Sequence, residues 1–300
     1  MSKKYVSEIF GYPHSNTSAG AQQVRASFQC PYTNNECDPI NKKSNLTDDS
    51  TGNLLLEHQT GACSAWYKPN WSGSPYPVII CPFRFYESNT VFNYIKNKFY
   101  NNNDEVAFTP EVGMSEIGRA DYFATRLVRC KNETELTNPT HIEIQSDGTT
   151  GTRGIVECVK DYFDGEDITN IGYGYGLNSK NSIKASSLQM IDKGFFCKEL
   201  GINSIWILQD YLFLQLQRFF PFTPIEVEDE ITSGYNIFFI TTSLNHSEDE
   251  NKYTLQIDKC YETTPDALRE SITNKDYSLD KDALISNINS KFHESENIIL

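Results

Sequence analysis

Two segments near the middle of the chain alternate polar and apolar residues, which is the pattern of strands with one buried face. One surrounds Asp121 and the other is His141–Gln145. Successive side chains of a strand point to opposite faces, so Glu143 and Gln145 share a face while the isoleucines beside them enter the core. The polar run Lys131–Thr140 predicts a connection between the two strands. We therefore expect Asp121 and Glu143 to meet at one end of a sheet.

Two carboxylates at a sheet end suit Mg²⁺, which uses few protein ligands and keeps waters that a phosphate can displace. An Asp strand followed by a Glu-x-Gln strand resembles the PD-(D/E)xK nuclease core, with Gln145 where Lys is commoner. An amide orients water or phosphate but has no positive charge, so a metal or a basic residue such as Arg119 or Arg153 would have to supply it. The alternative is an exposed hairpin face without a catalytic role.

Length and hydropathy predict a folded protein outside the membrane. The chain has 300 residues, and its hydrophobic and aromatic fractions of 38% and 13% are those of a globular protein. Its longest apolar runs, such as Tyr235–Ile240, are too short to span a bilayer. The first fifteen residues contain two lysines but no apolar core of a signal peptide. We expect a cytoplasmic protein with no membrane partner.

The net charge of −14 argues against a protein that simply coats DNA. The acidic excess is uneven, because Pro221–Leu300 holds 16 acidic and 6 basic residues, a net charge of −10. The first 220 residues carry only −4. A nucleic-acid partner is therefore compatible with the first two thirds of the chain.

Four of the eight cysteines lie within the first 81 residues: Cys30, Cys37, Cys63 and Cys81. Four thiolates complete a tetrahedral shell around zinc or iron. The surrounding segment is loop-rich and lacks a sustained hydrophobic period, so a metal would supply the stability that a small core cannot. The alternative is four unrelated thiols. The other cysteines have scattered apolar or helical contexts, and we interpret them as ordinary thiols: Cys130, Cys158, Cys197 and Cys260.

The expected organisation is an N-terminal segment, residues 1–88, and a larger domain, residues 89–300. Tyr76–Phe85 is expected to be a buried strand, and Asn89–Tyr100 a helix. Ser182–Leu200 predicts a helix whose apolar stripe includes Leu188. Gln189 and Lys193 could reach a site from this helix, although an exposed face is the default for both. Further helices are expected over Gly154–Phe163, Tyr211–Phe220, Asp266–Ile272 and Asp280–Phe292, and strands over Ser204–Leu208, Asn236–Leu244 and Tyr253–Lys259.

Several blocks together resemble the NotI-like family of type II restriction endonucleases. They are EIFGYPHSNTS at residues 8–18, FQCPYT at 28–33, GACS at 61–64, VIICPFRF at 78–85, GRADY at 118–122 and IEIQ at 142–145. Their order and approximate spacing fit the family. The similarity covers roughly residues 7–215 and fades in the acidic C-terminal third.

This resemblance implies an α/β (α+β) fold with a PD-(D/E)xK core, a mixed sheet flanked by helices and a small N-terminal four-cysteine segment. It implies a homodimer that cuts palindromic double-stranded DNA with Mg²⁺ and leaves 5′-phosphate ends. Asp121, Glu143 and Gln145 match the catalytic positions, and Glu111 is the best match for a further acidic residue, with Glu116 as competitor. The cysteine site would hold structural iron, whereas zinc is the generic expectation.

Three other functions remain open on the residues alone. One is a sequence-specific DNA-binding protein without cleavage, and another is a metal-bearing structural protein without nucleic acid. A third keeps the nuclease core but acts on single-stranded or structured DNA. For a homodimer, we expect the interface on the helices Ser182–Leu200 and Tyr211–Phe220.

Overall fold

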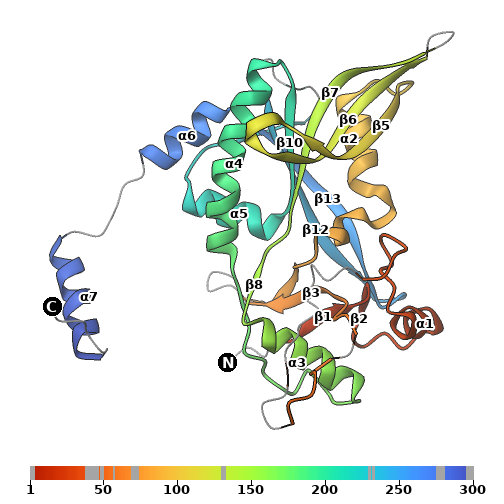
Figure 1. The fold of residues 1–300 in the computed structure, drawn as a ribbon, viewed down its shortest axis with the longest axis vertical. Coiled ribbons are helices and arrows are strands. Elements are labelled where there is room, and N and C mark those ends of the chain that lie inside the picture. Colours follow the sequence, from red (N-terminus) through yellow and green to blue (C-terminus); the bar gives the residue numbers. More distant parts are fainter. Residues whose placement is uncertain are drawn as a thin grey trace.

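The protein is a mixed α+β structure with two principal sheets (Figure 1). The structure is a computed structural model that describes residues 4–37, 47, 51–56, 58–68, 74–129, 133–228, 231, 234–274 and 281–294. The expected mixed sheet flanked by helices is confirmed. No helix among these residues is long and apolar enough to cross a membrane.

The larger sheet has seven strands in the order β11-β13-β12-β10-β7-β6-β5. β10 is parallel to both of its neighbours, and the other pairs are antiparallel. The strands are β5 (Glu105–Gly113), β6 (Arg119–Arg129), β7 (Thr134–Gln145), β10 (Asn203–Gln209), β11 (Ile225–Glu226), β12 (Ile237–Ser247) and β13 (Lys252–Thr263).

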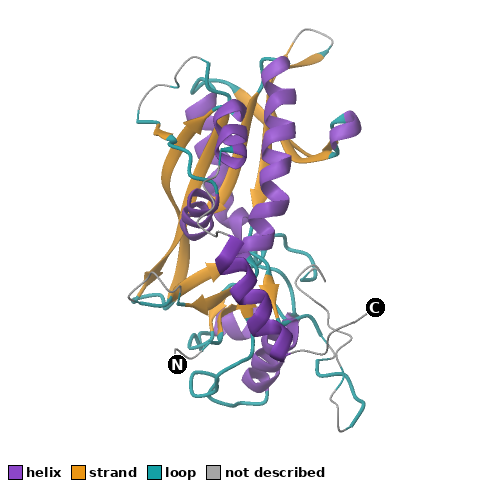
Figure 2. Cartoon of the chain, turned by 90° about the vertical axis from the view of Figure 1, so that its left-hand side faces the viewer, coloured by secondary structure: helices purple, strands orange, loops and turns teal. Residues whose placement is uncertain are grey.

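Helices cover both faces of this sheet (Figures 1 and 2). On one face, alternate residues of β10 and β12 pack against α4, α5 and α6. On the other, the intervening residues of the same strands pack against α2. This division follows from the period of two in a strand, which sends Trp206 to the first core and Ile205 to the second. The helices are α2 (Thr90–Phe99), α4 (Ser179–Glu199), α5 (Asp210–Phe219) and α6 (Pro265–Thr273).

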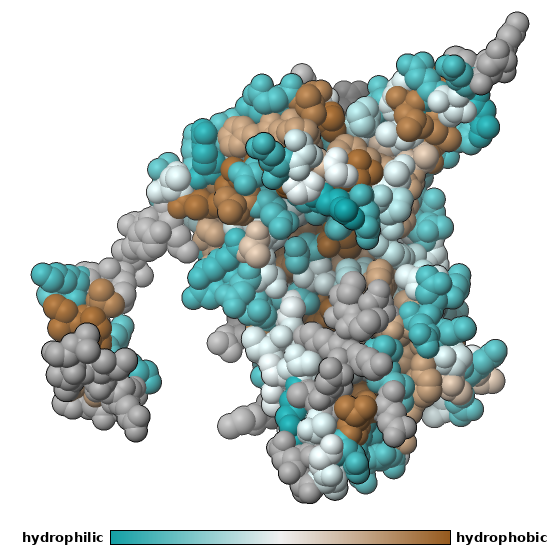
Figure 3. Space-filling view, in the orientation of Figure 1, coloured by the Kyte–Doolittle hydropathy of each residue, from teal (hydrophilic) through white to brown (hydrophobic). Residues whose placement is uncertain are grey.

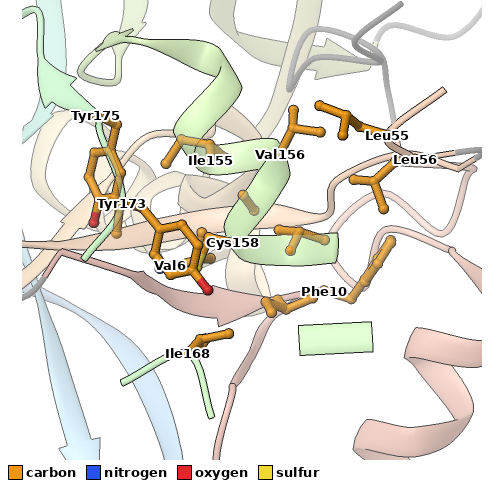
Figure 4. Packing of buried hydrophobic residues seen from close by; sticks show 14 of the residues in the cluster. Val6, Phe10, Leu55, Leu56, Ile155, Val156, Cys158, Ile168, Tyr173 and Tyr175 are labelled. Carbon is orange, nitrogen blue, oxygen red and sulfur yellow. Dashed lines mark hydrogen bonds between the residues drawn. The ribbon is translucent and has the colours of Figure 1, made fainter. Parts of the chain in front are cut away.

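The smaller sheet is formed by the N-terminal strands in the order β2-β1-β3-β4. Helix α3, from the middle of the chain, packs across β1 (Figure 4), where Cys158 and Val156 meet Val6 and Phe10 in one buried cluster. The N-terminal elements are β1 (Val6–Ile9), β2 (Tyr12–Pro13), α1 (Ala19–Ser27), β3 (Ala62–Tyr67) and β4 (Tyr76–Ile79). The connecting elements are η2 (Pro82–Asn89), η3 (Ser115–Ile117), β8 (Thr149–Thr150), α3 (Thr152–Phe163) and β9 (Gly176–Leu177).

A buried ion network joins the two sheets. Arg84, with no exposed surface, donates to Glu8 on β1 at 3.1 Å, to Glu87 at 2.8 Å and to the Tyr253 carbonyl of β13 at 3.0 Å. Ser64 Oγ also donates to Glu8 at 2.6 Å. Charges removed from water must be paired and hydrogen-bonded, so these contacts specify how the N-terminal sheet sits on the main one.

The structure corrects three local expectations. β7 begins at Thr134, so most of the predicted connection Lys131–Thr140 is strand. A bulge, with a register shift opposite Ala124 and Arg126 and a left-handed Asn138, accommodates the Asn-Pro pair inside the ladder. The predicted strand Tyr76–Phe85 ends at Ile79, because Pro82 lacks the N–H of a continuing ladder and opens η2 instead.

The third correction concerns α4. It begins at Ser179, three residues before the predicted start at Ser182. Leu188 is 63% exposed rather than part of the buried stripe, which contains Ile183 and Met190. Helix α7 (Lys281–Glu294) was also expected, and Figure 3 shows apolar side chains on its surface. The most exposed of these is Ile288, at 56%.

Candidate active site and cysteine cluster

Three acidic residues occupy one row across β5, β6 and β7. The pairing of Tyr122 with Ile142 places Asp121 opposite Glu143. The pairs on either side, Pro110 with Tyr122 and Val112 with Ala120, place Glu111 opposite Asp121. The two strands predicted around Asp121 and Glu143 are therefore antiparallel neighbours, as expected.

Asp121 is exposed at the start of β6, and its Oδ2 accepts a hydrogen bond of 2.8 Å from the backbone N–H of Ile144. Partial removal from water raises the pKa of Asp121, the Ile144 N–H opposes that effect, and the nearby charge of Glu143 raises it further. Two carboxylates thus lie close enough to repel each other. A cation bound between them would relieve this repulsion.

Glu143 is buried, with 6% of its surface exposed. Its Oε1 accepts from Lys193 Nζ on α4 at 2.5 Å and from His141 Nε2 at 2.8 Å. Lys193 also donates to the carbonyl of Arg119 at 2.7 Å and is only 4% exposed. The Lys193 ammonium therefore links α4 to two strands of the carboxylate row, β6 through Arg119 and β7 through Glu143.

The other predicted site residues have different surroundings. The side-chain amide of Gln145 donates to the Ser146 carbonyl at 2.8 Å. Glu111 has a left-handed backbone and pairs with Arg119 at 2.9 Å, both side chains being largely exposed. Glu116 lies in η3, outside the row. Of the two acidic candidates, Glu111 is the one that shares the row with Asp121.

Lys193 is the basic residue that contacts Glu143. Of the two basic candidates from the sequence, Arg119 pairs with Glu111 in the same row at 2.9 Å, whereas Arg153 pairs with Glu157 on α3 at 2.8 Å. The default expectation of an exposed Lys193 was wrong. Lys193 follows Met190 by three residues and precedes Cys197 by four, and these flanking side chains are both buried. This helical spacing, which puts a lysine on the buried face, was the available signal.

The side chains around Asp121 and Glu143 fit Mg²⁺. Mg²⁺ is commonly held by one or two carboxylates together with substrate phosphate and water, so a complete protein cage is not needed. Among the residues that the structure describes, no group of three or more His, Cys, Asp or Glu side chains is arranged to hold a metal ion. This agrees with the pairing of Glu111 to Arg119, which leaves two carboxylates for a cation.

The four early cysteines form two backbone-defined pairs. Cys30 and Cys37 flank a short antiparallel bridge, in which Cys30 N–H donates to the Asn35 carbonyl at 2.7 Å. Cys63 lies on β3, and its carbonyl accepts from the N–H of Cys81 at 3.2 Å. All four are buried and none forms a disulfide.

The thiols of the two cysteine pairs influence one another electrostatically. Burial raises the pKa of the Cys63 thiol well above its usual value, and the charges of Cys81, Glu8, Cys37 and Cys30 raise it further, in that order. All four thiols lie among the described residues, in which no group of three or more such side chains is arranged to hold a metal ion, so the structure does not bring the expected four-cysteine site together. Cys158, Cys197 and Cys260 are separately buried, and Cys130 lies outside the described residues.

The comparisons with known proteins do not assign the chain to a family. No family model matches the chain, and a search of curated proteins found no significant match. The structure itself shows a mixed sheet with helices on both faces, with Asp121 and Glu143 on the neighbouring strands β6 and β7 and Lys193 bound to Glu143 from α4.

Proposed function

We propose that the protein is a Mg²⁺-dependent endonuclease that hydrolyses phosphodiester bonds in double-stranded DNA. The observation that carries the proposal is the juxtaposition of Asp121 and Glu143 on neighbouring strands with the buried ammonium of Lys193. From α2 the chain runs through the antiparallel strands β5, β6 and β7, then through α3 and α4, to β10, which is parallel to β7, and this mixed sheet supports the proposal of a PD-(D/E)xK core.

Each residue has a role that follows from its chemistry. Asp121 and Glu143 hold the cation through carboxylate oxygens. Mg²⁺, when bound, supplies positive charge against the scissile phosphate and makes water a better nucleophile at neutral pH. Gln145 orients water or a phosphate oxygen through its amide. Lys193 supplies the positive charge that Gln145 lacks, and it holds the Glu143 carboxylate in place.

Lys193 takes this role from a different element than the usual lysine. In the commoner motif the lysine follows the glutamate by two residues on the same strand, where this chain has Gln145. Lys193 reaches Glu143 from α4 across the layer between helix and sheet. Its ammonium is shielded from water, so its attraction for nearby anions is stronger than that of an exposed lysine.

The resemblance to NotI-like enzymes extends the proposal to a type II restriction endonuclease, acting as a homodimer at a palindromic site. Two-fold symmetric DNA is read most simply by a two-fold symmetric protein. The exposed leucines Leu188 on α4 and Leu214 on α5 favour these helices as the interface. Cys30, Cys37, Cys63 and Cys81 would hold one structural iron or zinc ion.

The direct test is incubation of the purified protein with a long DNA duplex and Mg²⁺, followed by electrophoresis. Discrete fragments are expected from the wild type, and none from Asp121→Asn. Glu116→Gln is the matched control, because it removes a nearby charge outside the row. Intact DNA with the wild type under all divalent-cation conditions would overturn the proposal.

A second candidate is a nuclease for single-stranded or structured DNA, which would use the same carboxylates and lysine. The overall charge of −14 favours fewer backbone contacts than a long duplex interface requires. A smear on duplex, or cleavage restricted to forked and single-stranded substrates, would select this alternative.

A further inference from the structure

His141 lies on β7, two residues before Glu143, and has no exposed surface. It contacts Glu143 on its own strand and Ser204 on the neighbouring strand β10. Its Nδ1 lies 2.9 Å from Ser204 Oγ, and its Nε2 lies 2.8 Å from Glu143 Oε1. Ser204 Oγ is in turn 3.2 Å from Trp206 Nε1. The parallel pairing of β7 with β10 sets Ser204 beside His141 and Trp206 beside Glu143, so the chain of contacts is built into the strand register.

The donors and acceptors of this chain define where each proton lies. An indole N–H only donates, so Ser204 Oγ accepts from Trp206 and keeps its own hydrogen for His141 Nδ1. Glu143 Oε1 accepts from the Lys193 ammonium, so His141 Nε2 must be the donor to it. The imidazole therefore carries its proton on Nε2.

The result is a carboxylate with two different oxygens. Oε1 of Glu143 is held by two donors, whereas Oε2 accepts no hydrogen bond within the described part of the chain and is not among its buried unpaired atoms. One oxygen is thus fixed by the protein and the other is open. Residues that hydrogen-bond to a metal-ligating side chain orient that side chain and tune its affinity for the metal.

We propose that His141 is a positioning residue that directs the open oxygen of Glu143 toward the cation, with Ser204 and Trp206 orienting the imidazole so that its Nε2–H donates to Oε1. This inference rests on the proposed function for the cation that Glu143 serves. It assigns a role to a residue that has no contact with the substrate in that function.

The first test is NMR of the ¹⁵N-histidine-labelled wild-type protein. The expected result is that the His141 signal, assigned by its loss in His141→Gln, shows a ring protonated at Nε2. A ring protonated only at Nδ1, or an exchanging mixture of the two tautomers, would overturn the proposal. This measurement needs neither DNA nor a metal ion.

The second test is Mn²⁺ binding, measured by electron paramagnetic resonance, in His141→Leu, His141→Gln and wild type. Loss of the donor in His141→Leu should weaken Mn²⁺ binding about 10- to 100-fold. The amide of His141→Gln donates from nearly the same place and should restore most of it. His246→Leu, at an exposed histidine, is the control and should bind as the wild type does.

Equal Mn²⁺ affinity of His141→Leu and wild type would overturn the positioning role and leave the nuclease proposal standing. If wild type cleaves no DNA but these two tests succeed, the nuclease proposal fails while the positioning of a cation ligand stands. If His141→Leu unfolds, the tautomer measurement and His141→Gln still decide the question.

Discussion

Lys193 Nζ lies 2.5 Å from Oε1 of Glu143, although fifty positions separate the two residues in the chain. Both side chains are more than nine-tenths buried, so the pair is shielded from solvent and from salt. An ion pair in this position joins α4 to the strand that carries the candidate catalytic residues. It therefore links the packing of a helix to the charge of an active site.

Lys193→Met should lower the rate of DNA cleavage about 100- to 1000-fold, the range for loss of one positioned electrostatic group. It should also destabilise the fold by about 3 to 5 kcal/mol, because Glu143 would keep a buried charge without its partner. Cleavage kinetics and urea unfolding measure the two effects. Lys184→Met, at an exposed position of the same helix, is the control and should leave the cleavage rate and the stability near those of the wild type. Cleavage by Lys193→Met at the wild-type rate would disprove the role assigned to Lys193.

Asp121→Asn should abolish cleavage while specific DNA binding persists, and Glu143→Gln should behave likewise. Each change keeps the size of the side chain and removes one negative charge on which Mg²⁺ binding depends. Gel-shift assays in Ca²⁺ and cleavage assays in Mg²⁺ separate binding from catalysis. Wild-type cleavage rates in both variants would show that these carboxylates serve another purpose.

Cys63→Ser should remove the bound iron or zinc from the purified protein and unfold the N-terminal segment at lower temperature. Structural zinc contributes on the order of 10 kcal/mol to folding in small domains, so the loss should be large. Elemental analysis is expected to find about one metal ion per wild-type chain. Cys260→Ser, at a buried thiol on β13, is the control, and full occupancy in Cys63→Ser would mean that the four thiols do not share an ion.

Arg84→Met should destabilise the protein by about 3 to 5 kcal/mol, because Glu8 and Glu87 would lose their buried partner. Arg129→Met removes an exposed pair with Glu105 and should cost about 0 to 1 kcal/mol. Denaturant unfolding of the two variants compares them directly. Similar losses would mean that the buried network does not hold the two sheets together.

Asp147 should make a contribution to wild-type stability that is lost as pH rises from about 4 to 6. Burial raises the pKa of Asp147 to about 6, even though it accepts hydrogen bonds from Ser179 and Ser182. A carboxyl whose pKa is higher in the folded state binds its proton more tightly there, so the stability it adds at low pH is lost as pH rises through that range.

Asp147→Asn should remove this component of the pH dependence, since its amide does not titrate. Urea unfolding at several pH values, with wild type and variant compared at each, isolates the effect. Asp210→Asn is a useful companion, because burial also raises the pKa of Asp210 to about 6. An unchanged pH slope in Asp147→Asn would contradict the prediction.

Much of the secondary structure follows from local sequence. The period of two around Asp121 and Glu143 predicted β6 and the end of β7, and helical spacing predicted α2, α4 and α5. The sequence did not predict β5, because it is an edge strand that contains Pro110 and is buried only in part, so its alternation of polar and apolar residues is weak. Its position beside β6 nevertheless decides that Glu111, rather than Glu116, joins the row.

The sequence by itself determined which residues alternate, roughly where the helices lie, and that Asp121 and Glu143 lie on adjacent strands. Only the tertiary structure decided that Lys193 is the basic partner of Glu143, that Glu111 is turned toward Arg119, and that Glu8 meets Arg84. The physical reason is that periodicity reports which face of an element is buried. It does not report which distant side chain that face meets, because strand register and helix packing set that contact over the whole chain.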